Sequence, residues 1–299
     1  MRNAGTRFIT PEEERAPYPY GRVFRSLIIE LAVGGVLLGA VYALFTVLGF
    51  NLSGLSRSLL LLAVALVPLA SWAAFSWWPE RRVPQPRRQL PLVVVITALS
   101  AAAITWPLIE RVLQPDAWLA QSSAITRILG FTLAVGVPIE FTKYLVLRYS
   151  IWPSSIRTRM DGLAYSIAAS IGLATVFNLQ ALAVPGIEPG TLAILVFDNT
   201  AIGIAAGMLV GYGLAETAIG RPNPFIGPLT LSLAALVHGL AIPLRTGLTS
   251  GGFSLAGGSA SPVLGVAISV GLAVVVSIGT SFLISASERR EREAEAADL

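Results

Sequence analysis

Long apolar runs alternate with short polar or glycine- and proline-rich stretches along the chain. Each run holds about 20 residues, which is the length an α-helix needs to cross a bilayer. The pattern predicts helical spans at 26–50, 58–78, 91–113, 126–148, 161–184, 191–217, 226–244 and 262–285. The predicted fold class is therefore all-α, a polytopic transmembrane helical bundle of about eight spans.

Polar stretches divide the chain into three expected parts. These are a cytoplasmic N-terminal segment (1–25), an eight-helix membrane domain (26–285) and a charged cytoplasmic tail (286–299). Residues 1–25 are polar and contain several prolines, so the first apolar run is read as a retained helix and not as a cleaved signal peptide. A glycine- and serine-rich stretch, 245–262, predicts a flexible loop between the last two spans.

The arginines indicate the orientation. With eight spans and the N-terminus inside, only Arg57, Arg111, Arg127 and Arg245 fall on the outer face, and all other arginines fall on the cytoplasmic face. Because basic residues gather on the cytoplasmic side of membrane proteins, both termini are predicted to be cytoplasmic. The expected location is the cell (inner) membrane of a prokaryote.

Composition narrows the chemistry. Charged residues make up 13% of the chain, about half the share of a soluble domain, and the mean hydropathy is +0.72. The chain has no cysteine and one histidine, which excludes disulfides, cysteine-ligated zinc and sites with several histidines. Its basic pI is explained by the cytoplasmic arginines beside anionic lipid, so no nucleic-acid partner is expected.

A few ionisable residues lie well inside the predicted spans: Glu30, Glu140, Lys143, Asp198 and His238. A lone charge at mid-bilayer costs about 3 kcal/mol, so each needs a partner, a changed protonation state or a hydrated cavity. Glu140 and Lys143 stand three residues apart on one helix face and can neutralise each other.

For the other three residues, the expectations differ. Glu30 is expected at the cytoplasmic interface near Arg25, and His238 to donate to a backbone carbonyl. Asp198 is left either neutral or paired with Lys143. As a group, such residues usually face a shared polar interior.

Small residues are spaced for close helix packing. Gly203, Gly207 and Gly211 recur every four residues, so they lie along one face of the sixth span. We expect this face to approach a neighbouring helix, with no further role.

Four segments resemble the PrsW family of polytopic membrane proteases, over about residues 125–245. They are PIEFTKY (138–144), DGLAYSIAASIGLATVFNLQ (161–180), FDNTAIGIAAGMLVGYGLA (197–215) and ALVHGLAIPL (235–244). The resemblance implies an intramembrane peptidase, related to the CAAX prenyl endopeptidases. Glu140, Lys143, Asn178 and His238 stand at the family's motif positions.

The chain also departs from that pattern. Ile139, Phe177 and Ile242 stand where the resemblance implies a glutamate, a second glutamate and a final acid or amide. The histidine expected in the sixth span is missing. Glu140 and Asn178 are also predicted at different depths in the membrane, about 10 Å and 25 Å from its inner face.

Peptide hydrolysis needs an activated water, and thus a metal or a pair of carboxylates. We expect no cofactor. If the protein is active, the resemblance implies a divalent metal such as zinc, for which Glu140, Asp198 and His238 are the available ligands.

Three functions follow. The missing acids favour a non-catalytic relative that binds membrane lipids, transmembrane helices of other proteins, or a larger membrane complex. The second is an active intramembrane endopeptidase that uses Glu140 with Asp198 and His238. The third is a proton-coupled transporter in which the buried ionisable residues form a relay.

Overall fold

The computed structural model describes residues 20–82, 86–219, 223–249 and 262–297, which are helical apart from short connections. The α-helices are α2 (Tyr20–Tyr42), α3 (Gly54–Trp72), α4 (Trp78–Glu80), α5 (Leu90–Ser100), α6 (Pro115–Leu119), α7 (Ala124–Phe131), α8 (Val137–Ser150), α9 (Arg159–Ala181), α10 (Pro189–Ile219), α11 (Ile226–Thr249) and α12 (Pro262–Ala297). Wider π-helical turns join some of them: η1 (Ala43–Val47), η2 (Ala73–Trp77), η3 (Ala101–Thr105), η4 (Leu108–Leu113) and η5 (Thr132–Gly136).

Eight helical stretches in this part of the chain are long and apolar enough to cross a membrane, which confirms the predicted all-α bundle of spans. They are Val23–Val47, Gly54–Glu80, Leu90–Leu119, Ala124–Ser150, Arg159–Ala181, Pro189–Ile219, Ile226–Leu244 and Leu264–Arg290. Helix α12 continues through most of the charged tail to Ala297. The loop predicted at 245–262 lies largely outside the described residues.

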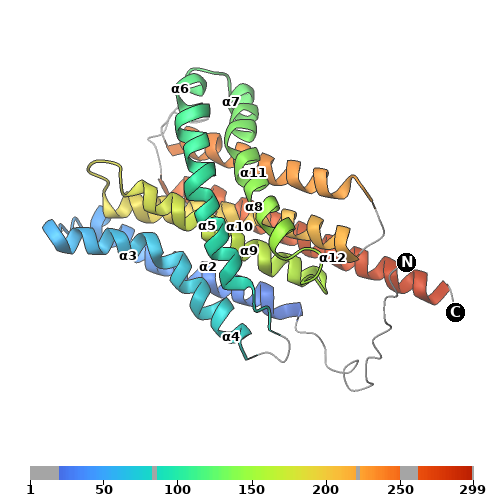
Figure 1. The fold of residues 1–299 in the computed structure, drawn as a ribbon. Coiled ribbons are helices and arrows are strands. Elements are labelled where there is room, and N and C mark those ends of the chain that lie inside the picture. Colours follow the sequence, from blue (N-terminus) through green and yellow to red (C-terminus); the bar gives the residue numbers. More distant parts are fainter. Residues whose placement is uncertain (1–19, 83–85, 220–222, 250–261, 298–299) are drawn as a thin grey trace.

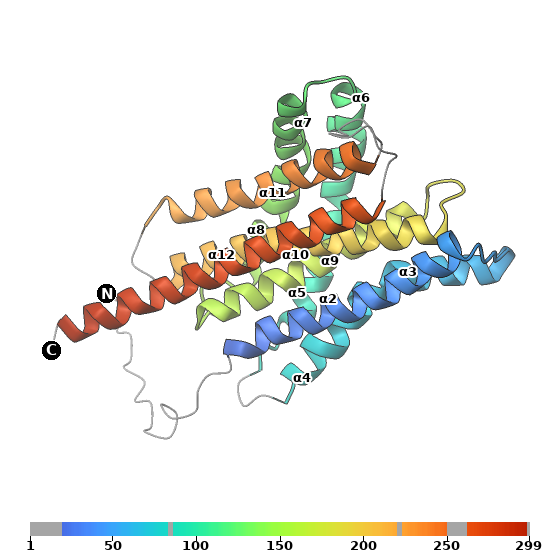
Figure 2. The same cartoon turned by 180° about the vertical axis from the view of Figure 1, so that it is seen from behind.

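Helices α9 and α10 form the centre of the bundle (Figures 1 and 2). Helices α2 and α3 lie on one side of them, α11 and α12 on the other, and α5 packs across α9. The α5–α6 and α7–α8 stretches are inclined steeply to α9 and α10 in both views. A steep tilt shifts the depth of side chains on α8 relative to those on α9.

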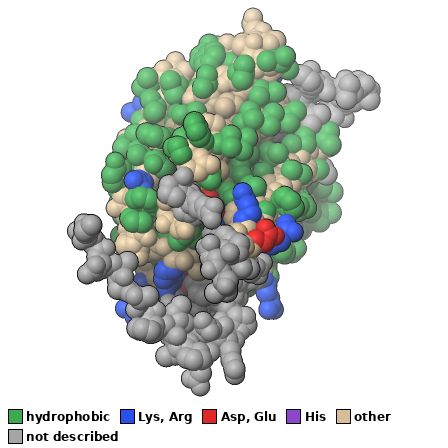
Figure 3. Space-filling view, turned by 90° about the vertical axis from the view of Figure 1, so that its right-hand side faces the viewer, with side chains coloured by type: hydrophobic (Ala, Val, Ile, Leu, Met, Phe, Trp, Pro, Cys, Tyr) green, Lys and Arg blue, Asp and Glu red, His purple; other side chains and the backbone are tan. Residues whose placement is uncertain are grey.

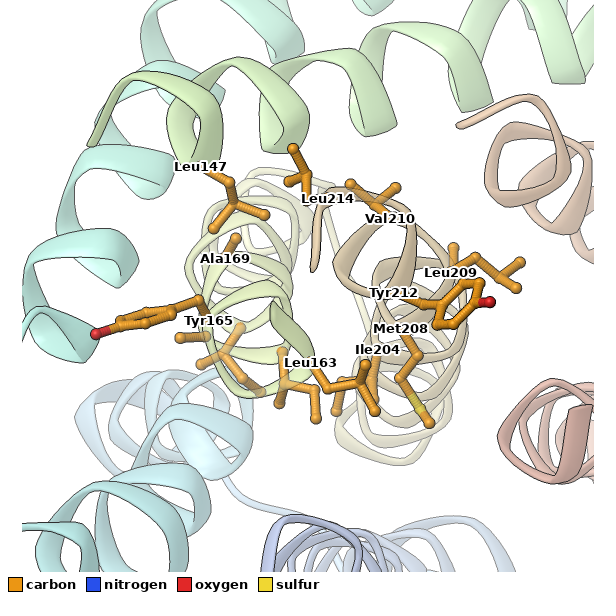
Figure 4. Close-up of a cluster of buried hydrophobic side chains, with 14 of the residues drawn as sticks. Leu147, Leu163, Tyr165, Ala169, Ile204, Met208, Leu209, Val210, Tyr212 and Leu214 are labelled. Carbon is orange, nitrogen blue, oxygen red and sulfur yellow. The ribbon is translucent and has the colours of Figure 1, made fainter. Parts of the chain in front are cut away.

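The core lies between α9, α10 and their neighbours (Figure 4). Both central helices are buried along most of their length, because they are apolar on every face and rich in small residues. A Cβ on Gly207 would meet Ser170, and one on Gly211 would meet Gly162. The predicted packing face is thus confirmed at these two positions, whereas a Cβ on Gly203 would meet no atom within 4 Å.

Four π-helical turns of the described chain end two residues before a proline inside the spans; at η4, before Pro115, the helix breaks at the left-handed Gln114, and at the other three it continues. Turns η2, η3 and η5 each end two residues before a proline: Pro79, Pro107 and Pro138. A proline lacks the N–H of a helical residue and crowds the carbonyl one turn back, and a widened turn relieves both problems. The apolar pattern therefore continues through each of these three prolines, and the span continues with it.

An ion-pair cluster fixes the start of α9. The Asp161 carboxylate accepts from the backbone N–H of Arg157 and of Thr158 at 2.9 Å, and from Arg87 Nε at 2.7 Å. Arg87 also binds Glu80 at 3.0 Å. The Arg87 side chain is buried between these two carboxylates. Asp161 is the third residue of α9 and forms a capping box with the N-cap residue Thr158.

Apolar side chains cover most of the outer surface, as expected for a protein whose solvent is lipid. Figure 3 looks onto the end of the bundle where α12 ends, and it shows basic side chains scattered around that end with apolar ones above them. Exposed large apolar residues occur on every span except α9 and α10 in their central parts.

Candidate functional site

The Glu140 carboxylate is the centre of a buried polar cluster. Its Oε1 atom lies 2.6 Å from Lys143 Nζ, on the same helix, and 2.8 Å from His238 Nε2, on α11. Glu140 and Lys143 are fully buried and His238 is 7% exposed. The predicted ion pair between Glu140 and Lys143 is present. The expected bond from His238 to a backbone carbonyl is replaced by the bond to this carboxylate.

Lys143 joins three helices. Its ammonium group donates to Glu140, to the carbonyl of Gly203 on α10 at 3.0 Å, and to Ser170 Oγ on α9 at 3.3 Å. An ammonium group has three donors, so each has a partner. The alternative pairing of Lys143 with Asp198 is not formed. Sequence reasoning missed Gly203 and Ser170 because a carbonyl and a lone serine give no signal in a helical pattern.

Glycine lets α8 and α11 approach closely enough for this contact. A Cβ on Gly136 would overlap the backbone carbonyl of Ala235, and one on Gly239 would overlap Thr132. Gly136 precedes Glu140 by four residues, and Ala235 precedes His238 by three. Both glycine contacts lie along η5, just before Glu140, and bring α11 close to the start of α8, where Glu140 meets His238.

A cavity of about 800 Å³ adjoins the cluster. His238, Gly203 and Asp198 line its inner part, and the connections around Asp116 and Pro185 line its outer part. It lies between η4, α6, the α7–α8 stretch, α9, α10 and α11. The imidazole is therefore the member of the buried cluster that faces open space.

Apolar side chains occupy the positions at which the family resemblance implies acids. Ile139, Phe177 and Ile242 line this cavity, although they come from three different helices. The same three residues belong to one apolar cluster, and the Phe177 ring meets that of Trp106 edge to face at 5.2 Å. The departures thus converge on one wall beside His238.

Asn178 lies apart from the buried cluster. Its Oδ1 accepts from Asn199 Nδ2 at 3.3 Å across the α9–α10 contact, and its Nδ2 is buried without a hydrogen-bond partner. The hydrogen-bonded partners of Glu140 are Lys143 and His238, so the tilt of α8 does not bring Asn178 into direct contact with it. Asp198 is fully buried and lines the cavity with Asn199.

The site does not fit a metal ion. Among the described residues, no group of three histidine or acidic side chains could hold one. The Oε1 atom of Glu140 already accepts from both an ammonium and an imidazole, and a metal cation bound to the unpartnered Oε2 atom would be repelled by the Lys143 ammonium on the same carboxylate. A catalytic zinc usually takes three protein ligands, and apolar side chains stand where the further acids are expected.

Glu30 belongs to a separate polar contact. It is 5% exposed, and the Ser76 hydroxyl donates to it, while Arg25 is exposed on the surface of α2. Its side chain faces the bundle interior, and its expected depth near the cytoplasmic surface stays a prediction.

Comparison with protein-family models identifies one family for this chain. The model described as the PrsW family intramembrane metalloprotease matches residues 85–240, slightly more than half of the chain. The match begins upstream of the motif-bearing region and includes α5 to α7. Comparison with curated proteins and with solved structures gave no significant match.

Proposed function

The chain belongs to the PrsW family of intramembrane metalloproteases, and from that premise we propose that it is a non-catalytic member that binds an apolar chain in its cavity. One observation carries the proposal: Ile139, Phe177 and Ile242 form one apolar cluster on the wall of the cavity that His238 also lines. A cavity of 300–1,000 Å³ with mostly apolar walls is typical of a small-ligand site.

The electrostatics of the buried cluster support the loss of catalysis. A general base must accept a proton from water, and the Lys143 ammonium, 2.6 Å from Glu140 Oε1, stabilises the ionised carboxylate and so weakens it as a base, although Glu140 Oε2 has no hydrogen-bond partner among the described residues. The Lys143 ammonium also compensates the carboxylate charge, which favours a structural ion pair. Glu140 and Lys143 then hold α8 against α9 and α10, and their role is to shape the cavity wall.

Family membership gives the setting of the proposed site. The protein is an integral membrane protein, and we place it in a prokaryotic cell membrane with both termini in the cytoplasm, as the arginine distribution indicates. Its partners are then membrane lipids or transmembrane segments that reach the cavity between tilted helices. A zinc ion has no role in this function.

A photoreactive alkyl probe tests the proposal. In the purified protein the probe should label residues that line the cavity, and Ile242→Trp, which fills the cavity, should abolish that labelling. Leu244→Trp is the matched control, because Leu244 lies two residues further along α11 and is exposed to lipid. Labelling confined to lipid-facing residues, or unchanged by Ile242→Trp, would refute a cavity-binding function.

A second function has one observation in its favour. His238 faces the cavity and lies 2.8 Å from Glu140, which is the arrangement of an acid–base pair. An endopeptidase would use this pair with Asp198, which lines the same cavity. Release of Glu140 from Lys143 would have to precede that reaction. A proton relay through the same residues, as in a transporter, would require the same release.

A further inference from the structure

The charged side chains at the outer part of the cavity are all acidic. Glu110, on η4, and Asp116, on α6, line that part and are exposed, and Asp198 lines the wall further in. The basic side chain in the lining is His238, at the inner end, where its Nε2 atom is bound to Glu140. Arg111 neighbours Glu110 in sequence but does not line the cavity.

The two outer acids act on each other. Both carboxylates line the same cavity, Glu110 from η4 and Asp116 from α6, and like charges gathered at one rim disfavour each other. A cation between them removes that repulsion. The rim is thus complementary to a positive group, whereas an anionic head group, such as a phosphate without an amine, would be repelled.

An aromatic wall lies directly beside the acidic rim. Trp106 stands one helical turn before Glu110 and also lines the cavity, with Phe177 packed against its ring. Ammonium groups bind favourably to the faces of tryptophan rings. Carboxylates and an indole together therefore present the two kinds of group that bind alkylammonium ions.

Deeper in the cavity the lining changes character. Leu173, Ile139 and Ile242 form much of the inner wall, which suits a hydrocarbon chain. A charged group is costly in the membrane interior but not at a hydrated rim, so the charged end of a ligand belongs outside and its chain inside. The order of polar rim and apolar interior is that of an amphiphile.

We infer that the ligand of this cavity is a cationic amphiphile, with an ammonium head at the rim formed by Glu110 and Asp116 and an apolar chain along the inner wall. This inference rests on the proposed binding function and adds the chemical class of the ligand. It commits the cavity to amine-bearing or quaternary-ammonium amphiphiles over anionic or uncharged ones of equal chain length.

Three photoreactive probes with the same twelve-carbon chain test the inference: one with a trimethylammonium head, one with a hydroxyl head and one with a sulfate head. They are compared on the purified full chain in a maltoside detergent, whose head group is uncharged. The ammonium probe should label the cavity at concentrations about fivefold to tenfold lower than the sulfate probe. Added salt should reduce this difference, because exposed charges are screened.

Two variants locate the effect. Glu110→Gln combined with Asp116→Asn should remove the preference for ammonium and leave labelling by the hydroxyl probe unchanged. Both residues are exposed, so the fold should tolerate the change. Glu188→Gln is the matched control, since Glu188 is an exposed acid in the α9–α10 connection that does not line the cavity.

The possible results distinguish a failure of the cationic-ligand inference from a failure of the proposed binding function. Equal labelling by all three probes, or a preference for ammonium that survives the double substitution, overturns the inference that the ligand is cationic. The proposed binding of an apolar chain would still stand. Failure of every probe to label the cavity overturns the proposed function itself. Selective labelling by the ammonium probe that is lost only in the double variant supports both the proposed binding function and the cationic ligand.

Discussion

At the scale of single residues, the stability of this protein depends on a carboxylate and an ammonium that have been removed from water together. Lys143 satisfies its three donors with groups on three helices, and Glu140 has one oxygen that accepts from two donors. Breaking a buried pair leaves an uncompensated charge, which is costlier than replacing both partners by apolar residues.

Lys143→Leu should therefore lower the free energy of unfolding by about 3–5 kcal/mol. Glu140→Leu combined with Lys143→Leu should recover part of that loss, because no lone charge is left. Thermal unfolding in detergent measures both, and Arg88→Leu, at an exposed position, serves as the control. A single variant as stable as the natural protein, or a double variant less stable than either single one, would show that the pair is not coupled.

The apolar wall makes a second prediction at this scale. Restoring acids with Phe177→Glu and Ile242→Asp places two carboxylates in the cavity beside His238. In the absence of metal, the free energy of unfolding of the variant should be lower than that of the natural chain by about 2 kcal/mol or more, because the new polar groups lack partners. Zinc should then raise its melting temperature and leave that of the natural chain unchanged, which differential scanning fluorimetry can measure. A zinc-dependent shift in the natural chain would contradict the absence of a metal site.

At the scale of helices, the site depends on how closely α8 and α11 approach. Gly136 allows the backbone of α11 to pass at a distance that no side chain would permit. The π-helical turn before Pro138 widens the helix at the same place. Both features bring Glu140 and His238 into contact, and both lie outside the motif residues.

Gly136→Ala should destabilise the protein by about 1–3 kcal/mol, the usual cost of overpacking, and reduce binding of alkyl probes. Gly271→Ala, on α12, is the control, because a Cβ at that glycine meets open space and the residue does not line the cavity. Melting temperature and probe labelling measure the two effects. A larger loss for Gly271→Ala than for Gly136→Ala would show that the close approach of α11 is not what holds the site.

The sequence predicted the elements better than it predicted the contacts between them. Apolar runs of span length located the helices, and the i, i+3 spacing predicted the Glu140–Lys143 pair, because both depend on local geometry. Contact of Glu140 with His238 depends on glycine contacts and helix tilt, which no local pattern contains. The capping box at the start of α9 could have been predicted, because Thr158 and Asp161 stand three residues apart just before an apolar run.

At the scale of the whole molecule, the predicted orientation in the membrane can be tested by labelling of single cysteines. The positive-inside rule predicts that the α4–α5 connection is cytoplasmic and the α9–α10 connection is outside. The chain has no cysteine, so single cysteines can be introduced without a background.

A membrane-impermeant maleimide should label Glu188→Cys in intact cells, and Arg88→Cys only after permeabilisation. Both positions are exposed. The reverse labelling pattern would show that the protein has the opposite orientation in the membrane, with the acidic rim of the cavity on the cytoplasmic side. The cationic-ligand inference would then apply to amphiphiles from the inner leaflet.

We propose that this member of a protease family binds an apolar chain in its cavity without cleaving peptide bonds. The most direct measurement is proteolysis of membrane-anchored substrates by the purified protein, with added zinc and with chelator. We predict no cleavage above that of Glu140→Gln under either condition. Cleavage that zinc stimulates, chelator stops and Glu140→Gln or His238→Ala abolishes would contradict the account.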